Sequence, residues 1–258
     1  MVTFLVLFPI LVMLGTSLKP ISQASSYPPV LIPAHPQPSN YAEAWRISPL
    51  GRFALNSVIV ASVITLGKTI TSALAALAFA RMRFWGRDIL FFIFLATLMV
   101  PEEVLLIPNF LTISRLGWLD TYWALVMPFL GSATGTFLLR QFFLTIPGEL
   151  EDAAKIDGCG PLRFLTTVLL PLSRPALGAF GIFSFLYAWN MYLWPLVVTR
   201  RTAMRTIQVG VAGFLSPRGE NPAVAMAAIT MVVAPTVIAF LLAQKHFVKG
   251  ISMTGLKG

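Results

Sequence analysis

Long apolar runs separated by short polar segments constrain the fold of this chain more than any other feature. The 258 residues are 57% apolar and only 11% charged, and the mean hydropathy is +0.79. Soluble domains carry about 25% charged residues, so the composition indicates a membrane protein. Backbone groups in lipid must be hydrogen-bonded within the fold, which leaves helices or a closed barrel. Continuous runs near the ~20 residues that cross a bilayer favour helices.

We therefore expect an all-α membrane protein with six transmembrane helices in a single domain, residues 1–258, whose core spans about residues 52–246. The predicted spans cover about residues 1–18, 53–80, 89–108, 122–139, 172–198 and 223–244. Residues 1–18 lack a preceding basic segment and a clear small-residue cleavage site. We expect them to be a retained first span, with a cleavable signal peptide as the alternative.

The segments between the spans differ in character. Residues 19–51 are rich in proline without hydrophobic periodicity, which predicts an extended loop held by contacts. Residues 81–87 form a tight basic turn, residues 147–170 are strongly polar, residues 199–222 carry arginines, and residues 245–258 form a short tail. With residues 147–170 inside, ten lysines and arginines lie on the inner side and eight on the outer side. This charge bias is too small to set the orientation by itself.

Several functional classes are disfavoured by the sequence. The net charge is +9, but the basic residues lie in short loops and form no stripe, so we expect no nucleic-acid partner. His35 and His246 are isolated, and no nucleophile–histidine–carboxylate arrangement is visible, so we expect neither a metal site nor catalysis. Cys159 is the single cysteine, which excludes an intrachain disulfide.

Residues 62–69 are similar to a phosphate-binding loop, with Ser62 in place of its first glycine. That loop needs a strand–turn–helix context to expose its backbone N–H groups. Here the motif lies inside an apolar run, so we expect no nucleotide to bind to it.

The polar segment, residues 147–170, separates two apolar stretches. We expect residues 151–158 to form a short helix along the membrane surface, with Asp152 near its positive N-terminus. Ala153 and Ala154 are small enough for this helix to enter a cleft, and Gly158 allows the backbone to leave it in a left-handed conformation. Pro171 precedes the next span. A merely polar connecting loop is the alternative.

The spacing of this segment resembles the signature loop of ABC importer membrane subunits. The pattern is Asp152-Ala-Ala, three residues, Gly158, nine residues, Val168, one residue, and Leu170-Pro171. Two positions depart conservatively from the family pattern, because Asp152 stands for a glutamate and Val168 for an isoleucine. Further stretches resemble the permeases of type I carbohydrate importers, in particular the second permease of glycerol-3-phosphate and maltose-type systems: Asn56-Ser57, 64–68, 132–143, 189–196 and 247–258.

This resemblance implies the type I ABC importer permease fold, with a cytoplasmic coupling helix, in the plasma (inner) membrane. The residues that it assigns to ATPase docking are Glu149, Glu151, Asp152, Ala153, Ala154, Lys155, Asp157, Gly158 and Pro171. It also implies a second homologous permease, an extracytoplasmic substrate-binding protein and two ATPase subunits that bind the ATP and magnesium, while this chain binds no cofactor.

For the substrate, the resemblance favours sn-glycerol-3-phosphate or a related phosphodiester or carbohydrate, imported by alternating access. Maltose-like or other oligosaccharides are the alternative. A secondary transporter is a more distant one, which would have an internal repeat and an ion site at the membrane midplane.

Candidate pathway residues lie in two predicted spans. Lys68 is about 15 residues into the second span, where a charge usually faces the bundle interior or a cavity; pairing with carbonyls or snorkelling is the alternative. Tyr187, Trp189 and Asn190 in the fifth span could hold a sugar by aromatic faces and hydrogen bonds. An aromatic belt at the interface explains nearby Tyr192 and Trp194 equally well.

Three further features complete the predictions. Glu102 and Glu103 lie near the outer end of the third span, where we expect solvation, with a gate contact as the alternative. Gly131 and Gly135 have the Gly-x3-Gly spacing of closely packed helices. We predict that Arg200, Arg201 and Arg205 attract an acidic binding protein or an anionic substrate, unless they only line a solvated loop.

Overall fold

The computed structural model describes the backbone of residues 2–27, 33, 35–215 and 221–252, and the side-chain environments of residues 7–27, 33, 35–214 and 221–238. Every regular element in these ranges is helical. The helices form two compact units, one of Met1–Ile59 with Trp189–Leu242 and one of Val60–Ala188 with Ala243–Gly258. Helices α4 (Leu50–Arg81) and α15 (Pro222–Ser252) contribute residues to both units.

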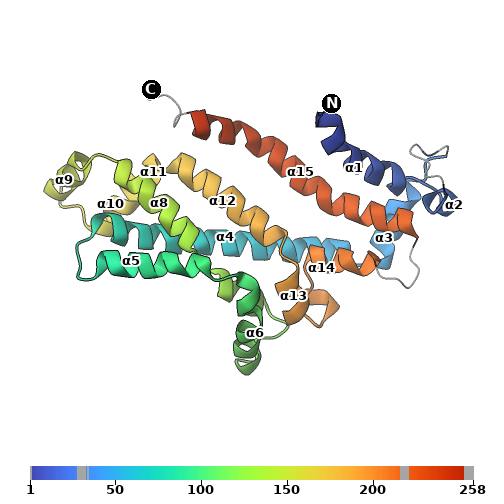
Figure 1. Cartoon of the computed structure of the whole chain (residues 1–258), viewed down its shortest axis with the longest axis horizontal. Helices are drawn as coiled ribbons and strands as arrows, with labels where there is room; N and C mark the ends of the chain where they lie inside the picture. The colour runs from blue at the N-terminus through green and yellow to red at the C-terminus, as the bar shows by residue number, and fades with distance from the viewer. Residues whose placement is uncertain (1, 28–32, 34, 216–220, 253–258) are drawn as a thin grey trace. The chain divides into compact units, whose positions relative to one another are not determined.

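The second unit is built on the C-terminal part of α4. This 32-residue helix is long and apolar enough to cross a membrane, in agreement with the predicted second span. A short turn at Gly86, with φ of 76°, follows it, and α5 (Arg87–Ala96) then runs back along α4 (Figure 1). The rings of Phe79 and Phe91 lie 5.3 Å apart between the two helices. The Arg140 guanidinium from α8 (Ala133–Thr145) lies 4.2 Å from the centroid of Phe91.

Three apolar segments of the second unit are bent, and the spans predicted for 89–108 and 122–139 each correspond to such a bent pair of helices rather than to one straight helix. Within the described residues, one helix alone meets the length and hydropathy of a span, or up to four do if each bent pair counts as one. In the first pair, one half is α5 with a 3-10 turn (Thr97–Met99). The other half is a second 3-10 turn (Glu102–Leu105) with α6 (Leu106–Arg115), and the two halves meet at 90°. Pro101 lies at this break, and a proline keeps the residue before it out of the helical conformation.

The other two bends also follow local chemistry. Helix α7 (Tyr122–Val126), with the turn Met127–Phe129, meets α8 at 46°. A segment of α10 (Pro161–Phe164), a π turn (Leu165–Leu169) and α11 (Leu170–Leu172) meets α12 (Arg174–Trp189) at 84°. Pro175 lies just after that bend, and it has no N–H to offer to the preceding turn. Residues 161–170, predicted as part of a polar loop, are therefore mostly an apolar helical segment, and the predicted fifth span begins at Arg174 and is broken after Trp189.

Polar side chains satisfy the backbone where α7 and α8 meet. The Ser132 hydroxyl accepts a hydrogen bond from the Gly135 N–H at 3.0 Å and so caps α8. From α4, the Thr71 hydroxyl donates to the Leu130 carbonyl at 2.6 Å, and the Ser72 hydroxyl donates to the Ser132 carbonyl at 3.3 Å. A broken helix in a membrane needs such partners, because lipid supplies none.

The prediction for the glycine pair is half right. A Cβ at Gly135 would lie 2.2 Å from a ring carbon of Phe180 and 2.6 Å from the Ser72 hydroxyl, so this glycine permits close packing. A Cβ at Gly131 would meet nothing within 4 Å. The close approach therefore depends on one glycine and not on the spaced pair.

In the first unit, the proline-rich segment is not the extended loop that we predicted. Helix α1 (Val2–Ser17) covers the predicted first span and is followed by α2 (Ile21–Ala24) and α3 (Ser39–Ile47). The Asn40 amide donates to the carbonyls of Ser17 and Lys19, both at 2.9 Å. These bonds hold α3 against the end of α1, so the expected contact exists but is made by a helix.

Residues 199–222 also contain regular structure. After α13 (Leu193–Val198) come a 3-10 turn (Thr202–Met204), α14 (Ile207–Ala212) and a last turn (Gly213–Leu215). The fully buried Asn56 amide donates to the carbonyls of Ala203 and Arg205 at 2.8 and 2.9 Å. The segment is thus packed on α4 rather than looping into solvent. Helix α15 contains the sixth predicted span and extends through part of the predicted tail, whose residues 253–258 lie outside the described ranges.

Candidate functional site

The N-terminal part of the polar segment forms helix α9 (Glu149–Ile156), which begins two residues earlier than predicted. Glu149, Glu151 and Asp152 all lie in its first turn and Lys155 in its last. Carboxylates near the N-terminus and a cation near the C-terminus both complement the helix dipole. The prediction that Asp152 lies at the N-terminal end is confirmed.

Helix α9 ends in the left-handed conformation predicted for Gly158. The φ of Gly158 is 71°. The N–H of Cys159 donates to the Ala154 carbonyl at 2.8 Å, and the N–H of Gly158 donates to the Lys155 carbonyl at 3.0 Å. These two bonds form a Schellman motif, which turns the chain sharply out of the helix. Asp157 lies at the C-cap position.

The two faces of α9 have different environments. Ala154 and Cys159 pack against the buried cluster of the second unit, which includes Leu77, Phe143 and Phe164. On the opposite face, Asp152 and Ala153 are exposed, and Ile156 is 87% exposed. Ala153 and Ala154, predicted to enter a cleft together, therefore face different ways.

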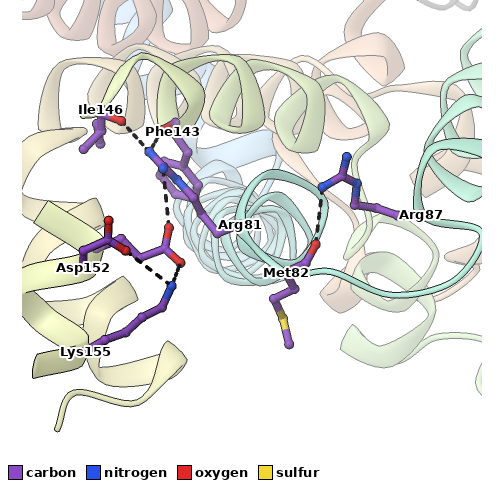
Figure 2. Close-up of polar contacts among 8 residues, drawn as sticks. Arg81, Met82, Arg87, Phe143, Ile146, Asp152 and Lys155 are labelled. Atoms are coloured by element: carbon purple, nitrogen blue, oxygen red, sulfur yellow. Dashed lines mark hydrogen bonds and ion pairs between the residues drawn. The ribbon is translucent and has the colours of Figure 1, made fainter. Parts of the chain in front are cut away.

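Arg81 fixes the inner face of α9 to two other helices. This last residue of α4 has a side chain that is 13% exposed. Its Nη2 donates to the carbonyls of Phe143 and Ile146 at the end of α8, at 2.5 and 2.6 Å, and its Nη1 lies 3.5 Å from Glu151 Oε2 (Figure 2). Arg81 thus ties the ends of α4 and α8 to α9.

Glu151 is also paired within α9. Its Oε1 lies 2.8 Å from Lys155 Nζ, while Asp152 Oδ1 is 3.9 Å from the same nitrogen. Glu151 is therefore committed to contacts within the chain, whereas Asp152, whose side chain is 77% exposed, makes only the longer ion pair with Lys155. In the sequence, Arg81 is distinguished only as the first residue of a basic turn. An arginine that ends an apolar helix is ordinary at an interface, so nothing in the sequence marked its three contacts.

A pocket of about 790 Å³ lies between α9 and the basic turn after α4. Its polar lining combines both signs of charge: Arg81, Arg83, Arg87, Glu151, Asp152 and Lys155. The Arg87 guanidinium donates to the Met82 carbonyl at 3.5 Å across the turn (Figure 2). Pro171, also predicted to belong to this region, is exposed in α11 and outside the pocket lining.

Two of the predicted pathway residues meet in the second unit. Lys68 Nζ lies 4.2 Å from the centroid of the Tyr187 ring, and the Tyr187 hydroxyl donates to Glu102. Residues 62–69 are helical throughout, so they do not form the phosphate-binding loop that their sequence resembles. Glu102 was expected to be solvated at an interface. It is exposed, as expected, and it also accepts a hydrogen bond from the tyrosine; a gate contact stays a prediction.

The remaining pathway candidates belong to the first unit. Trp189 is 6% exposed, which does not suit direct contact with a passing molecule. Asn190 is exposed, and its Oδ1 accepts a hydrogen bond from the Gln208 amide at 3.3 Å. Of the two aromatic residues considered for an interfacial belt, Tyr192 is exposed, whereas Trp194 is buried.

The three arginines predicted to contact a binding protein have unequal exposure. Arg200 and Arg201 are exposed, and Arg205 is half-buried beside the 3-10 turn that Asn56 holds. Two of the three therefore present their charge on the surface of the first unit.

Comparisons with known proteins give one consistent family. Residues 68–253 match the family described as binding-protein-dependent transport system inner membrane component. The chain is 38% identical over 255 residues to the sn-glycerol-3-phosphate transport system permease protein UgpE of Yersinia pestis bv. Antiqua (strain Antiqua), covering 96% of this chain and 91% of that protein. It is 41% identical over 237 residues to the same-named protein of Agrobacterium fabrum (strain C58 / ATCC 33970), covering 88% of this chain and 84% of that one.

Solved structures share the fold. A chain of a bacterial ABC transporter involved in the import of the acidic polysaccharide alginate superposes with a TM-score of 0.87 at 24% identity, covering 95% of this chain and 92% of that one. A chain of a bacterial alginate ABC transporter, in complex with an alginate pentasaccharide-bound periplasmic protein, gives a TM-score of 0.66 at 14% identity over 94% of this chain and 88% of that one. At these identities the likeness concerns the fold alone.

Proposed function

Since this chain belongs to the family of binding-protein-dependent transport system inner membrane components, we propose that it is the permease subunit of an ATP-driven importer that works by alternating access. It pairs with a second, similar permease, rests on two ATPase subunits that bind ATP and magnesium, and receives substrate from an extracytoplasmic binding protein. The family favours this function over the secondary transporter that the sequence left open as a distant alternative.

The proposed topology is six spans in the inner membrane. Support comes from the one long apolar helix, the three bent pairs and the two shorter apolar helices, Leu7–Ser17 and Pro222–Ile238, which together make six segments. With α9 on the cytoplasmic side, residues 19–51 and 199–222 are extracytoplasmic and residues 245–258 are cytoplasmic.

Helix α9 is the element that docks on the ATPase. The single observation that carries this role is the division of its faces: Glu151 and Ala154 hold the helix to its own unit, while Asp152, Ala153 and Ile156 face outward. An isoleucine that is 87% exposed beside an alanine and a carboxylate suits a partner's cleft better than open water. Gly158 and Pro171 bound the docking segment by ending α9 and by preceding the bend into α12.

The geometry around Arg81 suggests how docking is transmitted. When the two ATPase subunits close on ATP, the displacement of α9 passes to the ends of α4 and α8 through the contacts that Arg81 makes with Glu151, Phe143 and Ile146. Packed helices shift as bodies rather than deform continuously, so a displacement at one end moves the pathway-lining part of α4.

The proposed substrate is sn-glycerol-3-phosphate or a related phosphodiester. Support comes from the names of the relatives at 38 and 41% identity over most of both chains. The exposed Arg200 and Arg201 would suit an acidic binding protein or an anionic substrate. A maltose-like oligosaccharide is the second candidate, and the aromatic and amide groups of Tyr187 and Asn190 would suit it.

The docking role is tested in the purified importer by a matched pair of variants, Ile156→Gln and Trp85→Gln. Both residues are highly exposed apolar side chains of the second unit, at 87 and 97%. Burial of an isoleucine side chain in a partner is worth about 2 kcal/mol, so Ile156→Gln should weaken ATPase association roughly tenfold or more. Trp85→Gln should leave it unchanged. Equal effects of the two variants would refute docking through the outer face of α9.

A further inference from the structure

Lys68, Tyr187 and Glu102 come from three separate helical segments of the second unit. Lys68 lies within α4, Glu102 opens the 3-10 turn before α6, and Tyr187 lies near the end of α12. The ammonium group lies over the tyrosine ring at 4.2 Å, and the tyrosine hydroxyl donates to the Glu102 carboxylate. One cation, one hydroxyl donor and one carboxylate are thus gathered at one place.

This cluster lies deep along α4 and at breaks in the neighbouring helices. Lys68 precedes Arg81, at the α9 end of the helix, by 13 residues, which corresponds to about 20 Å. Glu102 directly follows the break at Pro101, where the helical segments meet at 90°. Ionisable residues and interrupted helices at membrane depth are energetically costly. Where they occur, they usually line a substrate or ion pathway.

Charge neutralisation alone explains the cluster poorly. A polar cluster that only stabilises the fold is expected to be shielded from solvent, yet Glu102 is exposed, Tyr187 is 36% exposed and Lys68 is only half-buried. The groups therefore remain open to a molecule that arrives from outside the unit. Of the three, the carboxylate lies on the shortest element, a four-residue turn after a proline, and can be withdrawn with the least disruption of packing.

We propose that Lys68 and Tyr187 form a binding site for the phosphoryl group of the transported substrate, and that the Glu102 carboxylate occupies this site when substrate is absent. This deepens the proposed function, on which it rests. An ammonium group and a phenolic hydroxyl are donors that serve carboxylate and phosphate oxygens alike. A phosphate that displaces Glu102 gives the Tyr187 hydroxyl one anionic acceptor in place of another, and it adds an acceptor for the Lys68 ammonium group.

The exchange also has a consequence for selectivity. Because the site already holds its own anion, a small inorganic anion gains little by entering, whereas a substrate that also makes contacts through its glycerol part gains enough to displace Glu102. Removing the Glu102 charge should therefore increase affinity for anions in general. Removing the Lys68 charge should decrease affinity for the phosphorylated substrate and leave a neutral polyol unaffected.

The test measures equilibrium binding of labelled sn-glycerol-3-phosphate to the assembled permease–ATPase complex without its binding protein, with glycerol as the neutral probe. Relative to wild type, Glu102→Gln should tighten glycerol-3-phosphate binding and Lys68→Met should weaken it, each on the order of ten- to hundred-fold, which is the value of one charge-assisted hydrogen bond. Tyr187→Phe should weaken it less. Glu103→Gln is the matched control, because it removes a neighbouring charge but leaves the carboxylate that accepts the tyrosine hydrogen bond; its effect should be small.

Unchanged or weaker binding by Glu102→Gln overturns the proposal, as does an effect of Glu103→Gln equal to that of Glu102→Gln. The Glu102 variant decides the matter even where Lys68→Met assembles poorly. ATPase stimulation by loaded binding protein, measured on the same complexes, reports separately on the importer function. ATPase stimulation can persist although the variants do not show the predicted order of affinities for glycerol-3-phosphate. In that case the proposed phosphoryl site is wrong and the permease function stands.

Discussion

Replacement of Arg81 by methionine should be far more damaging than loss of its ion-pair partner. Arg81 donates to two carbonyls at 2.5 and 2.6 Å from a side chain that is 13% exposed. A hydrogen bond to a charged group contributes about 1.5–3 kcal/mol, so loss of both should cost roughly 3–5 kcal/mol after partial rehydration. The pair with Glu151, at 3.5 Å and partly exposed, contributes about 1 kcal/mol or less.

The substitutions at Arg81 and Glu151 are compared in the reconstituted importer by thermal unfolding and by the number of substrate molecules moved per ATP. We expect Glu151→Gln to be slightly less stable than wild type, Arg81→Lys to be less stable than Glu151→Gln, and Arg81→Met to be the least stable. Lysine offers a point charge that can serve one carbonyl but lacks the planar fork that serves two. Because Arg81 joins α9 to α4 and α8, ATP hydrolysis should persist in Arg81→Met while transport per ATP falls.

A Glu151→Gln variant as unstable as Arg81→Met would refute this reasoning, because the ion pair would then outweigh the carbonyl bonds. Unchanged transport per ATP in a well-folded Arg81→Met complex would refute the role of Arg81 in transmission. The two readouts are independent, so each part can fail alone.

Substitutions at three further positions, one of them with a control at Gly131, have defined outcomes. Gly158→Ala forces a side chain into a positive φ of 71° and should cost about 1–2 kcal/mol in a thermal unfolding measurement, and should shift the end of α9 enough to reduce ATPase stimulation. Gly135→Ala should lower stability by about 1–3 kcal/mol, because its Cβ would overlap Phe180 and Ser72, while Gly131→Ala should be neutral by the same measurement; equal effects would contradict the packing described. Asn56→Leu removes two bonds from a fully buried amide and should cost about 2–4 kcal/mol, whereas a change below about 0.5 kcal/mol would show that the 3-10 turn does not need it.

The sequence predicted those parts of the fold that depend on neighbouring residues alone. The continuous apolar run of α4 and the end of α9 at Gly158 follow from hydropathy and from glycine's access to positive φ. The bends could not be located in the same way, because hydropathy does not distinguish a straight span from two helices that meet at Pro101. Helix α3 was missed because prolines dominate its surroundings, and only the long-range bonds of Asn40 show what holds it.

The candidate site was only partly predictable for a related reason. The residues of α9 were identified by their spacing, but the spacing does not say that Ala154 packs on the core cluster while Ala153 is exposed. Lys68 and Tyr187 were singled out separately, 119 positions apart, and only the packing of α4 and α12 brings them together. The role of Arg81 could not be predicted, because two of its partners are backbone carbonyls. Every residue has a carbonyl, so the sequence does not indicate which ones an arginine binds.

The most direct measurement is uptake of labelled sn-glycerol-3-phosphate into proteoliposomes that contain this chain, its partner permease and the ATPase subunits. ATP is enclosed on the side of α9 and the binding protein is added on the opposite side. We predict accumulation only when both are present, and its loss in Gly158→Asp without loss of complex assembly. Accumulation without ATP, driven by an ion gradient, would contradict the proposed function, and accumulation of an oligosaccharide instead would keep the mechanism but overturn the substrate.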